Sequence, residues 1–281
     1  METRKLKNGG LRTKGITKTS TSEKPLITVV TVVYNGVATL EQTILSVINQ
    51  TYDNVEYIVI DGASTDGTLD VIKKYEDKID YWQSEPDKGI YDAMNKGVVL
   101  SNGEWINFMN SGDLFYEATT MKKIFIRDYS EYDVIYGNVV NKWSIGFEVK
   151  YPLEKQYPEM PFSHQSCFTK TRLVKKYKFD TDYKIAADRE MFYRIIKNEK
   201  GSHRLYLNEN ISIFDCIDSF SVKNEVKGYK ERAKFLGMNK VSFMIGILEL
   251  RLKCFIKQKF PFIIDCKRKN RIKRAAKLKC L

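Results

Sequence analysis

The stretch Trp105-Ile-Asn-Phe-Met-Asn-Ser-Gly-Asp113 joins a short apolar run to a polar ending. Its first five residues are mostly apolar and predict a buried strand, and Asn110-Ser-Gly is a turn signal that ends this strand. The turn presents one carboxylate, Asp113, just past the strand. In an open α/β sheet, ligands bind outside the carboxyl ends of the strands. Asp113 is therefore a candidate ligand-facing residue, and the alternative is a turn aspartate that hydrogen-bonds its own backbone.

Strands and helices alternate upstream of this stretch. The β-branched run at residues 26–33 predicts a strand that is buried on both faces, and residues 55–60 and 81–84 predict two more strands. Apolar residues at helical spacing follow each of them, the last group at residues 90–100. Short links between alternating elements predict an α/β fold with a mostly parallel sheet and helices on both faces.

Downstream of Asp113 the pattern is less regular. We expect a helix at residues 119–126, a strand at 133–136 and another strand at 162–169. The segment 137–161 is aromatic and without clear periodicity, which suits a lid or an acceptor-binding region.

The charge of the chain is divided unevenly. The net charge is +12, but residues 223–281 hold 18 Lys and Arg against 4 Asp and Glu, and residues 1–24 hold 7 against 2. The remaining residues 25–222 therefore carry −7. A protein that binds nucleic acid through its site would concentrate positive charge there, so we expect no nucleic-acid partner. We expect three parts: a flexible basic arm (1–24), an α/β domain (25–222) and a basic tail (223–281).

The basic tail has an amphipathic pattern. Apolar residues alternate with clustered Lys and Arg, which is typical of helices that lie on a membrane surface. Its longest apolar run spans residues 241–248, whereas crossing a bilayer takes about 20 residues. No secretory signal is visible, and the five cysteines are odd in number and lack metal-site spacing. We therefore expect a cytoplasmic protein that associates peripherally with the inner face of the cell membrane.

Carboxylates also follow the second predicted strand. Asp61 and Asp66 stand beside Gly62 and Gly67, which permit close backbone approach. A carboxylate at this place can accept hydrogen bonds from a nucleobase or a ribose hydroxyl, and the alternative is a turn followed by a helix cap. There is no GxGxxG and no GxxxxGK[ST] motif, so a dinucleotide-binding fold and a P-loop ATPase are not indicated.

Taken together, these segments resemble family 2 glycosyltransferases. The resemblance covers about residues 25–215 and is closest to the branch that builds bacterial surface polysaccharides. It is carried by residues 25–35 (PLITVVTVVYN), 46–51 (SVINQT), 56–68 (EYIVIDGASTDGT), 84–97 (SEPDKGIYDAMNKG) and 103–113 (GEWINFMNSGD). It implies a GT-A fold, a nucleotide-diphosphate-sugar donor, with a UDP-sugar favoured, and inversion at the anomeric carbon.

The resemblance also implies roles for single residues. It places ten residues at the nucleotide-sugar site, with Asp61 as the acid that binds uracil or ribose: Thr31, Val33, Tyr34, Asp61, Asp66, Asp87, Lys88, Gly89, Asn110 and Asp113. For Asp87 a solvated turn is an equal alternative.

A divalent ion, Mg²⁺ or Mn²⁺, is expected at Asp113, which matches the last acid of the family's metal motif. Asn110 and Gly112 stand where aspartates are commoner in the family. One carboxylate and one amide would hold the ion more weakly than two carboxylates, because hard cations favour charged oxygen ligands.

On the acceptor side, Asp188 matches the family's catalytic base, and Asp182 is the fallback. Inversion by single displacement needs a group that takes the acceptor hydroxyl's proton. Asp188 stands at the head of an amphipathic helix, and its alternative is a helix-terminal carboxylate without a chemical role. His164 and Gln165 are expected beside the acceptor, although a polar strand end would also account for His164.

The sequence therefore predicts an inverting transferase that moves a sugar to a hydroxyl of a lipid-linked or oligosaccharide acceptor. Two alternatives remain open. One is a noncatalytic sugar-nucleotide-binding or scaffold protein of the same fold, and the other is a nucleic-acid-binding protein that uses the basic tail.

Overall fold

The computed structural model describes residues 6–21, 23–153, 159–199, 201–217 and 219–259. Within these residues, ten strands form one sheet, and nine of them follow the order β1-β4-β3-β2-β5-β9-β7-β10-β6, with β8 paired to β7. The strands are β1 (Lys7–Gly9), β2 (Ile27–Val33), β3 (Val55–Asp61), β4 (Tyr81–Ser84), β5 (Trp105–Phe108), β6 (Leu114–Phe115), β7 (Val134–Trp143), β8 (Gly146–Lys150), β9 (Cys167–Lys170) and β10 (Arg204–Asp215).

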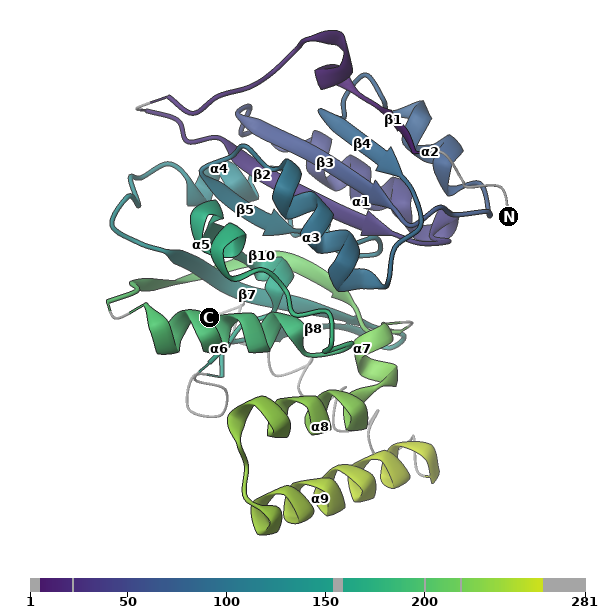
Figure 1. Cartoon of the computed structure of the whole chain (residues 1–281), viewed down its shortest axis with the longest axis vertical. Helices are drawn as coiled ribbons and strands as arrows, with labels where there is room; N and C mark the ends of the chain where they lie inside the picture. The colour runs from purple at the N-terminus through teal and green to yellow at the C-terminus, as the bar shows by residue number, and fades with distance from the viewer. Residues whose placement is uncertain (1–5, 22, 154–158, 200, 218, 260–281) are drawn as a thin grey trace.

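Helices cover both faces of this sheet (Figure 1). They are α1 (Val37–Ile48), α2 (Thr68–Lys74), α3 (Ile90–Leu100), α4 (Thr120–Ile124), α5 (Thr171–Tyr177), α6 (Ala187–Asn198), α7 (Phe220–Lys223), α8 (Glu225–Leu236) and α9 (Lys240–Lys259). Two short 3₁₀ helices, η1 (Leu11–Lys14) and η2 (His164–Ser166), complete the set. The α/β prediction with helices on both faces is confirmed.

The first half of the sheet is parallel, as predicted. β2 pairs in parallel with β3 and β5, and β3 pairs in parallel with β4. All seven residues of β2 are buried, which suits a β-branched strand between two layers of helices. Alternate residues of β2 enter different cores: Val30 packs on the side of α3, α5 and α6, and Val29 packs on the side of α1, α2 and α4.

The second half of the sheet is mixed. β9 runs antiparallel to both β5 and β7, and β10 runs parallel to β7. The expectation of irregular structure at residues 137–161 was wrong for its first part, because β7 extends to Trp143 and forms a hairpin with β8. Residues 154–158 lie outside the described residues. The strand expected at 162–169 is also different, since η2 occupies residues 164–166 and β9 begins at Cys167.

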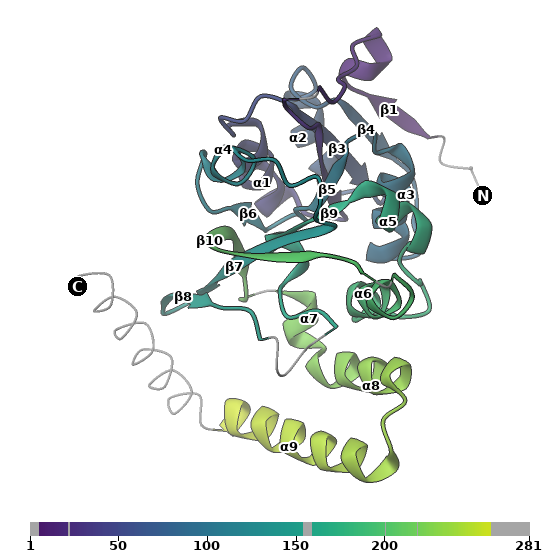
Figure 2. The same ribbon diagram turned by 90° about the vertical axis from the view of Figure 1, so that its left-hand side faces the viewer.

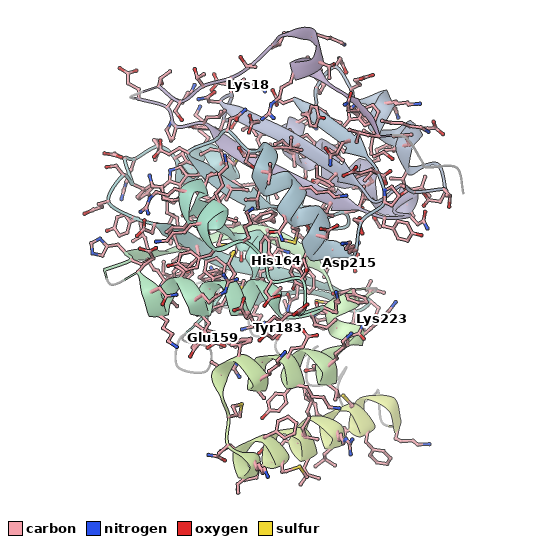
Figure 3. All side chains as sticks on the ribbon, viewed as in Figure 1. Lys18, Glu159, His164, Tyr183, Asp215 and Lys223 are labelled. Atoms are coloured by element: carbon pink, nitrogen blue, oxygen red, sulfur yellow. The ribbon has the colours of Figure 1, made fainter. Side chains whose placement is uncertain are left out.

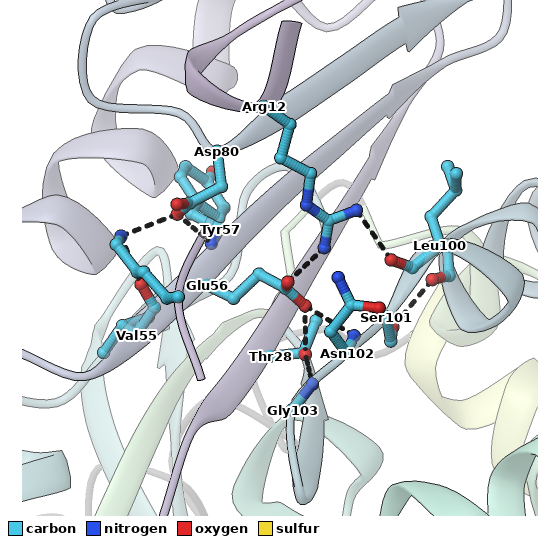
Figure 4. Close-up of polar contacts among 12 residues, drawn as sticks. Arg12, Thr28, Val55, Glu56, Tyr57, Asp80, Leu100, Ser101, Asn102 and Gly103 are labelled. Atoms are coloured by element: carbon cyan, nitrogen blue, oxygen red, sulfur yellow. Dashed lines mark hydrogen bonds and ion pairs between the residues drawn. The ribbon is translucent and has the colours of Figure 1, made fainter. Parts of the chain in front are cut away.

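The N-terminal segment differs from the flexible arm that we expected. β1 pairs with β4 and forms one edge of the sheet, and Arg12 forms an ion pair with buried Glu56 of β3 (Figure 4). Thr28 donates a hydrogen bond to the same carboxylate at 2.6 Å, and the backbone N–H of Asn102 donates another at 2.8 Å. A buried carboxylate requires such partners, and the basic residues of the segment supply part of them.

The C-terminal helices project from the α/β body. α8 contacts α6 and α7 on one side and α9 on the other, and α9 is the outermost described element in both ribbon views (Figures 1 and 2). No helix among the described residues is long and apolar enough to cross a membrane.

Candidate functional site

The candidate site lies where the carboxyl ends of the parallel strands meet. β2, β3, β4 and β5 end at one edge of the sheet because they run in the same direction. Since β9 runs antiparallel to β5, η2 and His164, which precede β9, reach the same edge. Asp188 arrives in the first turn of α6.

At the end of β3, the carboxylate of Asp61 is fully buried and hydrogen-bonded. It accepts bonds from Ser84 Oγ at 2.6 Å and from Ser64 Oγ at 2.5 Å, and the backbone N–H of Ser64 also points to it. Ser84 is the last residue of β4. The network fixes the orientation of Asp61 at the carboxyl edge.

The loops after β2 and β3 are tied to each other. Asn35 donates its backbone N–H to Ser64 Oγ, and its side-chain oxygen accepts from the backbone N–H of Thr65. Asn35 and Ala63 have φ angles of 49° and 62°, in the left-handed region that alanine rarely adopts. Such strain persists only where the surroundings hold it, and it is concentrated at functional sites.

Asp66 joins the same two loops. Its carboxylate accepts bonds from the hydroxyl and backbone N–H of Thr68 at 2.5 and 3.0 Å, and from the backbone N–H of Val37 at 3.1 Å. Asp66 therefore connects the beginnings of α1 and α2. Because its oxygens are used in this way, we assign it to the support of the loops.

An open face of the site is formed by Tyr34, Gly62 and Asp87. Tyr34 is exposed directly after β2. A Cβ at Gly62 would overlap the Asp87 carboxylate and touch the Tyr34 ring, so glycine permits this close approach. Burial raises the pKa of Asp87 above its ordinary value, and the backbone N–H of Gly89 opposes the shift. Lys88 and Gly89 are exposed on the same turn.

Asn110 and Asp113 follow β5 and are both buried. Asn110 Nδ2 lies 3.2 Å from His164 Nε2, while Asn110 Oδ1 has no hydrogen-bond partner within the described part of the chain. Burial raises the pKa of Asp113 to about 7, although His164 and Gln165 lower it. His164 and Asp215, both labelled in Figure 3, are charged groups that act on this carboxyl.

These two residues fit a weakly held divalent ion. A buried amide oxygen without a partner and a buried carboxyl are oxygen ligands of the kind that Mg²⁺ and Mn²⁺ take. Among the residues that the structure describes, no three His, Cys, Asp or Glu side chains gather as a metal cluster. The protein therefore offers few ligands, and a bound diphosphate would have to complete the coordination.

Asp188 and His164 form the second part of the site. Asp188 Oδ2 lies 3.5 Å from His164 Nδ1, and Asp188 Oδ1 accepts from the Tyr91 hydroxyl at 3.2 Å and from the backbone N–H of Arg189 at 2.9 Å. Because His164 also contacts Asn110 through its other nitrogen, it links the Asp188 carboxylate to the end of β5.

Each member of this pair stabilises the charged form of the other. Burial would raise the pKa of Asp188, but the hydrogen bond and positive charge of His164 outweigh it and hold the pKa below its ordinary value. Burial would lower the pKa of His164, but Asp188 and Asp113 hold it above its ordinary value. Asp188 is therefore ionised at neutral pH.

Not every predicted residue reaches the surface of the site. Thr31 is fully buried, and its hydroxyl bonds to Tyr57 and to the Met109 carbonyl, so it supports the sheet from within. Val33 is also buried, and Gln165 is buried beside Asp113.

Sequence reasoning assigned no role to Ser84 or Tyr91, although both lie in the quoted segment 84–97. Their contacts depend on partners 23 and 97 residues away in the chain, and no local pattern shows such a pairing. Asp215, at the end of β10, acts on the Asp113 carboxyl from a distant part of the chain, and no local pattern shows this relation either.

Residues 28–222 match the model of glycosyl transferase family 2, and this range ends just before the basic tail. A PGL/p-HBAD biosynthesis glycosyltransferase of Mycobacterium bovis is 29% identical over 185 residues, which cover 62% of this chain and 71% of the relative.

Two solved structures share the fold. TarS 1–349 of S. aureus in complex with UDP-GlcNAc superposes with a TM-score of 0.61 at 17% identity, covering 75% of this chain and 65% of that one. The mannosyltransferase PcManGT of Pyrobaculum calidifontis, in complex with GDP-Man and Mn²⁺, gives a TM-score of 0.58 at 16% identity, with 78% and 66% covered. Both likenesses show the GT-A fold.

Proposed function

The chain belongs to glycosyl transferase family 2, and from this premise we propose that it is an inverting glycosyltransferase that uses a nucleotide-diphosphate sugar. The observation that carries the proposal is the convergence of two groups at one sheet edge. Asp61 and Asp113 lie at strand ends, and the ionised Asp188 is linked to Asn110 through His164.

The donor occupies the strand-end half of the site in this proposal. Tyr34 offers an exposed aromatic face beside Gly62. The Asp61 carboxylate is buried and bonded to Ser64 and Ser84, so in this proposal a uracil or ribose group replaces one of these serine hydrogen bonds. TarS and PcManGT carry different nucleotides in their complexes, and for this chain we favour a UDP-sugar.

The chemical step is a single displacement. The acceptor oxygen bonds to the anomeric carbon, the bond from that carbon to the diphosphate oxygen breaks, and the acceptor proton passes to an Asp188 oxygen. An ionised carboxylate with a low pKa can serve because the hydroxyl becomes acidic as its oxygen bonds to carbon. His164 and Tyr91 keep the carboxylate in place.

Asn110 and Asp113 would hold Mg²⁺ or Mn²⁺. When bound, such an ion neutralises negative charge that develops on the leaving diphosphate. Asp113 must give up its proton to serve as a ligand, and because burial raises its pKa to about 7, the carboxylate is mostly available only above neutral pH.

We further propose that the acceptor is a lipid-linked or oligosaccharide hydroxyl in bacterial surface polysaccharide synthesis, and that the enzyme works at the inner face of the cell membrane. The name of the mycobacterial relative, which refers to PGL/p-HBAD biosynthesis, supports an acceptor of this kind. The basic residues beyond 223 support the location, because each Lys or Arg near anionic lipid contributes about 1 kcal/mol.

Replacing Asp188 with Asn tests the base. The substitution keeps the size of the side chain and removes the proton acceptor, so we expect transfer to fall by about 10²–10⁴-fold, while the affinity for UDP, measured by calorimetry, is retained. The matched control is Asp182→Asn, which alters an exposed carboxylate six residues earlier and is expected to keep transfer.

Unchanged transfer by Asp188→Asn would contradict the assigned base. A wild-type protein that binds the donor but transfers sugar to no acceptor would instead indicate a noncatalytic sugar-nucleotide-binding protein of the same fold. Binding to DNA that depends on residues 223–281, without donor binding, would indicate the nucleic-acid alternative.

A further inference from the structure

One face of α9 is occupied by α8. The Tyr229 ring of α8 stacks on Phe243 of α9, with ring centroids 6.1 Å apart. Gly246 lies under the same tyrosine, and a Cβ there would overlap it. Lys253 forms an ion pair with Glu225 of α8 at 2.7 Å. These contacts fix the rotation of α9 about its own axis.

The opposite face of α9 exposes a continuous row of apolar side chains. Their spacing of three and four residues places them on one side of the helix, and the row is about 21 Å long at 1.5 Å per residue. Each is between 51% and 70% exposed, and together they form what we call the α9 stripe: Val241, Met244, Ile245, Leu248, Leu252 and Phe255.

Exposed apolar side chains are normal when scattered, but a contiguous row indicates a contact surface. The described residues leave this row uncovered. The surrounding charge is strongly positive, since Lys and Arg outnumber Asp and Glu ten to three between residues 223 and 259. The contact surface therefore combines an apolar row with an excess of cations.

We propose that the α9 stripe lies in the headgroup region of an anionic lipid bilayer, with the helix axis parallel to the membrane. An amphipathic helix that combines an apolar face with Lys and Arg binds in this way. The inference deepens the proposed location at the membrane by naming the helix face that makes the contact. It does not depend on which sugar is transferred.

The other arrangements fit less well. The stripe covers one side of α9 only, and no described helix can span a bilayer, so an in-plane position follows. A second copy of the chain could cover the stripe by a helix pair with the same three-and-four spacing. Such a pair would bring two segments of the same positive charge together, which opposes association.

Sedimentation with lipid vesicles tests the proposal, using the full chain without donor or acceptor. We expect binding to vesicles of phosphatidylcholine mixed with phosphatidylglycerol and much weaker binding to phosphatidylcholine alone. The double variant Leu248→Ser, Leu252→Ser is expected to lower binding at least about tenfold, because two apolar side chains no longer enter the lipid.

The matched control carries the same kind of change on the α/β body. Val99→Ser, Ile126→Ser replaces two exposed apolar residues of similar exposure and is expected to bind vesicles like the wild type. Melting temperatures of both double variants show whether the fold is intact. Because the readout is vesicle binding, an inactive or mistaken transfer reaction does not affect it.

Three outcomes would overturn the proposal. The first is a wild-type chain that does not bind anionic vesicles. The second is binding that is unchanged by the stripe variant, which would mean that another surface makes the contact. The third is a dimer, seen by sedimentation velocity without lipid, that the stripe variant converts to a monomer, which would assign the stripe to a second copy of the chain.

Discussion

Several groups contact the Asp188 carboxylate at the same time, and its lowered pKa reduces its strength as a base. The Tyr91 hydroxyl and the backbone N–H of Arg189 donate hydrogen bonds to one of its oxygens, and Nδ1 of the His164 ring lies 3.5 Å from the other. In the proposed reaction the acceptor hydroxyl approaches a carboxylate whose pKa His164 keeps low. We interpret His164 as a positioning residue that fixes the orientation of the Asp188 carboxylate and at the same time lowers its basicity.

Replacing His164 tests this interpretation. In the proposed mechanism transfer requires ionised Asp188, so activity should be lost as the pH falls through the pKa of Asp188. Because His164 lowers that pKa, His164→Gln is expected to raise it and to move the acid limb of the rate profile to higher pH. The measurement is kcat against pH at saturating donor.

The other histidine provides the control. His203 is exposed in a loop, where its ring contacts the Glu131 carbonyl, and His203→Gln is expected to leave the acid limb in place. An acid limb that does not move in His164→Gln would mean that the histidine has no influence on the base.

The raised pKa of Asp113 makes the stability of the protein depend on pH, at the same carboxyl that is proposed to hold the metal ion. The carboxyl has a pKa of about 7 when folded and 3.8 as its ordinary value. A group whose folded pKa is raised contributes stability that is fully present below the unfolded value and is lost as the pH rises through the folded value. The free energy of unfolding of the ligand-free protein should therefore decline between about pH 4 and pH 7 from this group.

Asp113→Asn should remove that decline. Above about pH 7 we expect the variant to be more stable than the wild type by on the order of 2 kcal/mol, because a neutral amide replaces a buried charge. The metal-dependent part of donor binding should be lost at the same time. Urea unfolding across the pH range measures the first effect, and a variant less stable than the wild type above neutral pH would contradict it.

At the scale of elements, the N-terminal segment behaves as part of the sheet. Arg12, in η1, pairs with Glu56 of β3 and donates to the Leu100 carbonyl at 2.8 Å. Lys18 pairs with buried Asp80 at 2.8 Å and donates to the Val55 carbonyl. The segment therefore connects β3 with the start of β4 and the end of α3.

Removing one of these cations should destabilise the domain. Arg12→Leu leaves the Glu56 carboxylate buried without its guanidinium, and we expect a loss of about 3 kcal/mol in the free energy of unfolding. Lys14→Leu, an exposed residue of the same 3₁₀ helix, is the matched control and is expected to change stability little. Equal urea midpoints for the two variants would show that the ion pair does not hold the segment.

This element shows where sequence reasoning stops. The strands β2 and β3 and their alternation with helices follow from apolar periodicity, which is local information. The ordering of residues 7–18 depends on buried acids at Glu56 and Asp80, which are distant in the chain. A basic, Gly-rich segment without periodicity gives no sign of such partners.

The same distinction applies to the site. Asp61, Asp113 and Asp188 could be named from motifs because each stands next to a predicted strand end or helix start. The roles of Thr31 and Asp66 could not be predicted from the sequence. Their hydrogen bonds to Met109 and Val37 decide whether their side-chain oxygens are free for a ligand. Tertiary contacts determine which members of a motif face a ligand.

At the scale of the whole molecule, the parts fit one sequence of events. In the proposed function, the acidic α/β body presents the strand ends to a donor, and Asp188 receives the acceptor's proton. The basic helices α8 and α9 extend from the body (Figure 2), where the α9 stripe can lie on lipid. An enzyme held in this way would meet a lipid-linked acceptor at the surface where that acceptor resides.

The central claim is that the carboxyl edge of the sheet binds a nucleotide sugar, and a thermal-shift screen tests it most directly. The wild-type chain is heated with UDP-, GDP- and dTDP-sugars, each with and without Mn²⁺. A ligand that binds the folded state raises the melting temperature by mass action, at about 2–4 °C per kcal/mol for a chain of this size. We predict a rise with a UDP-sugar that Mn²⁺ increases, and no rise with any of the donors would contradict the account.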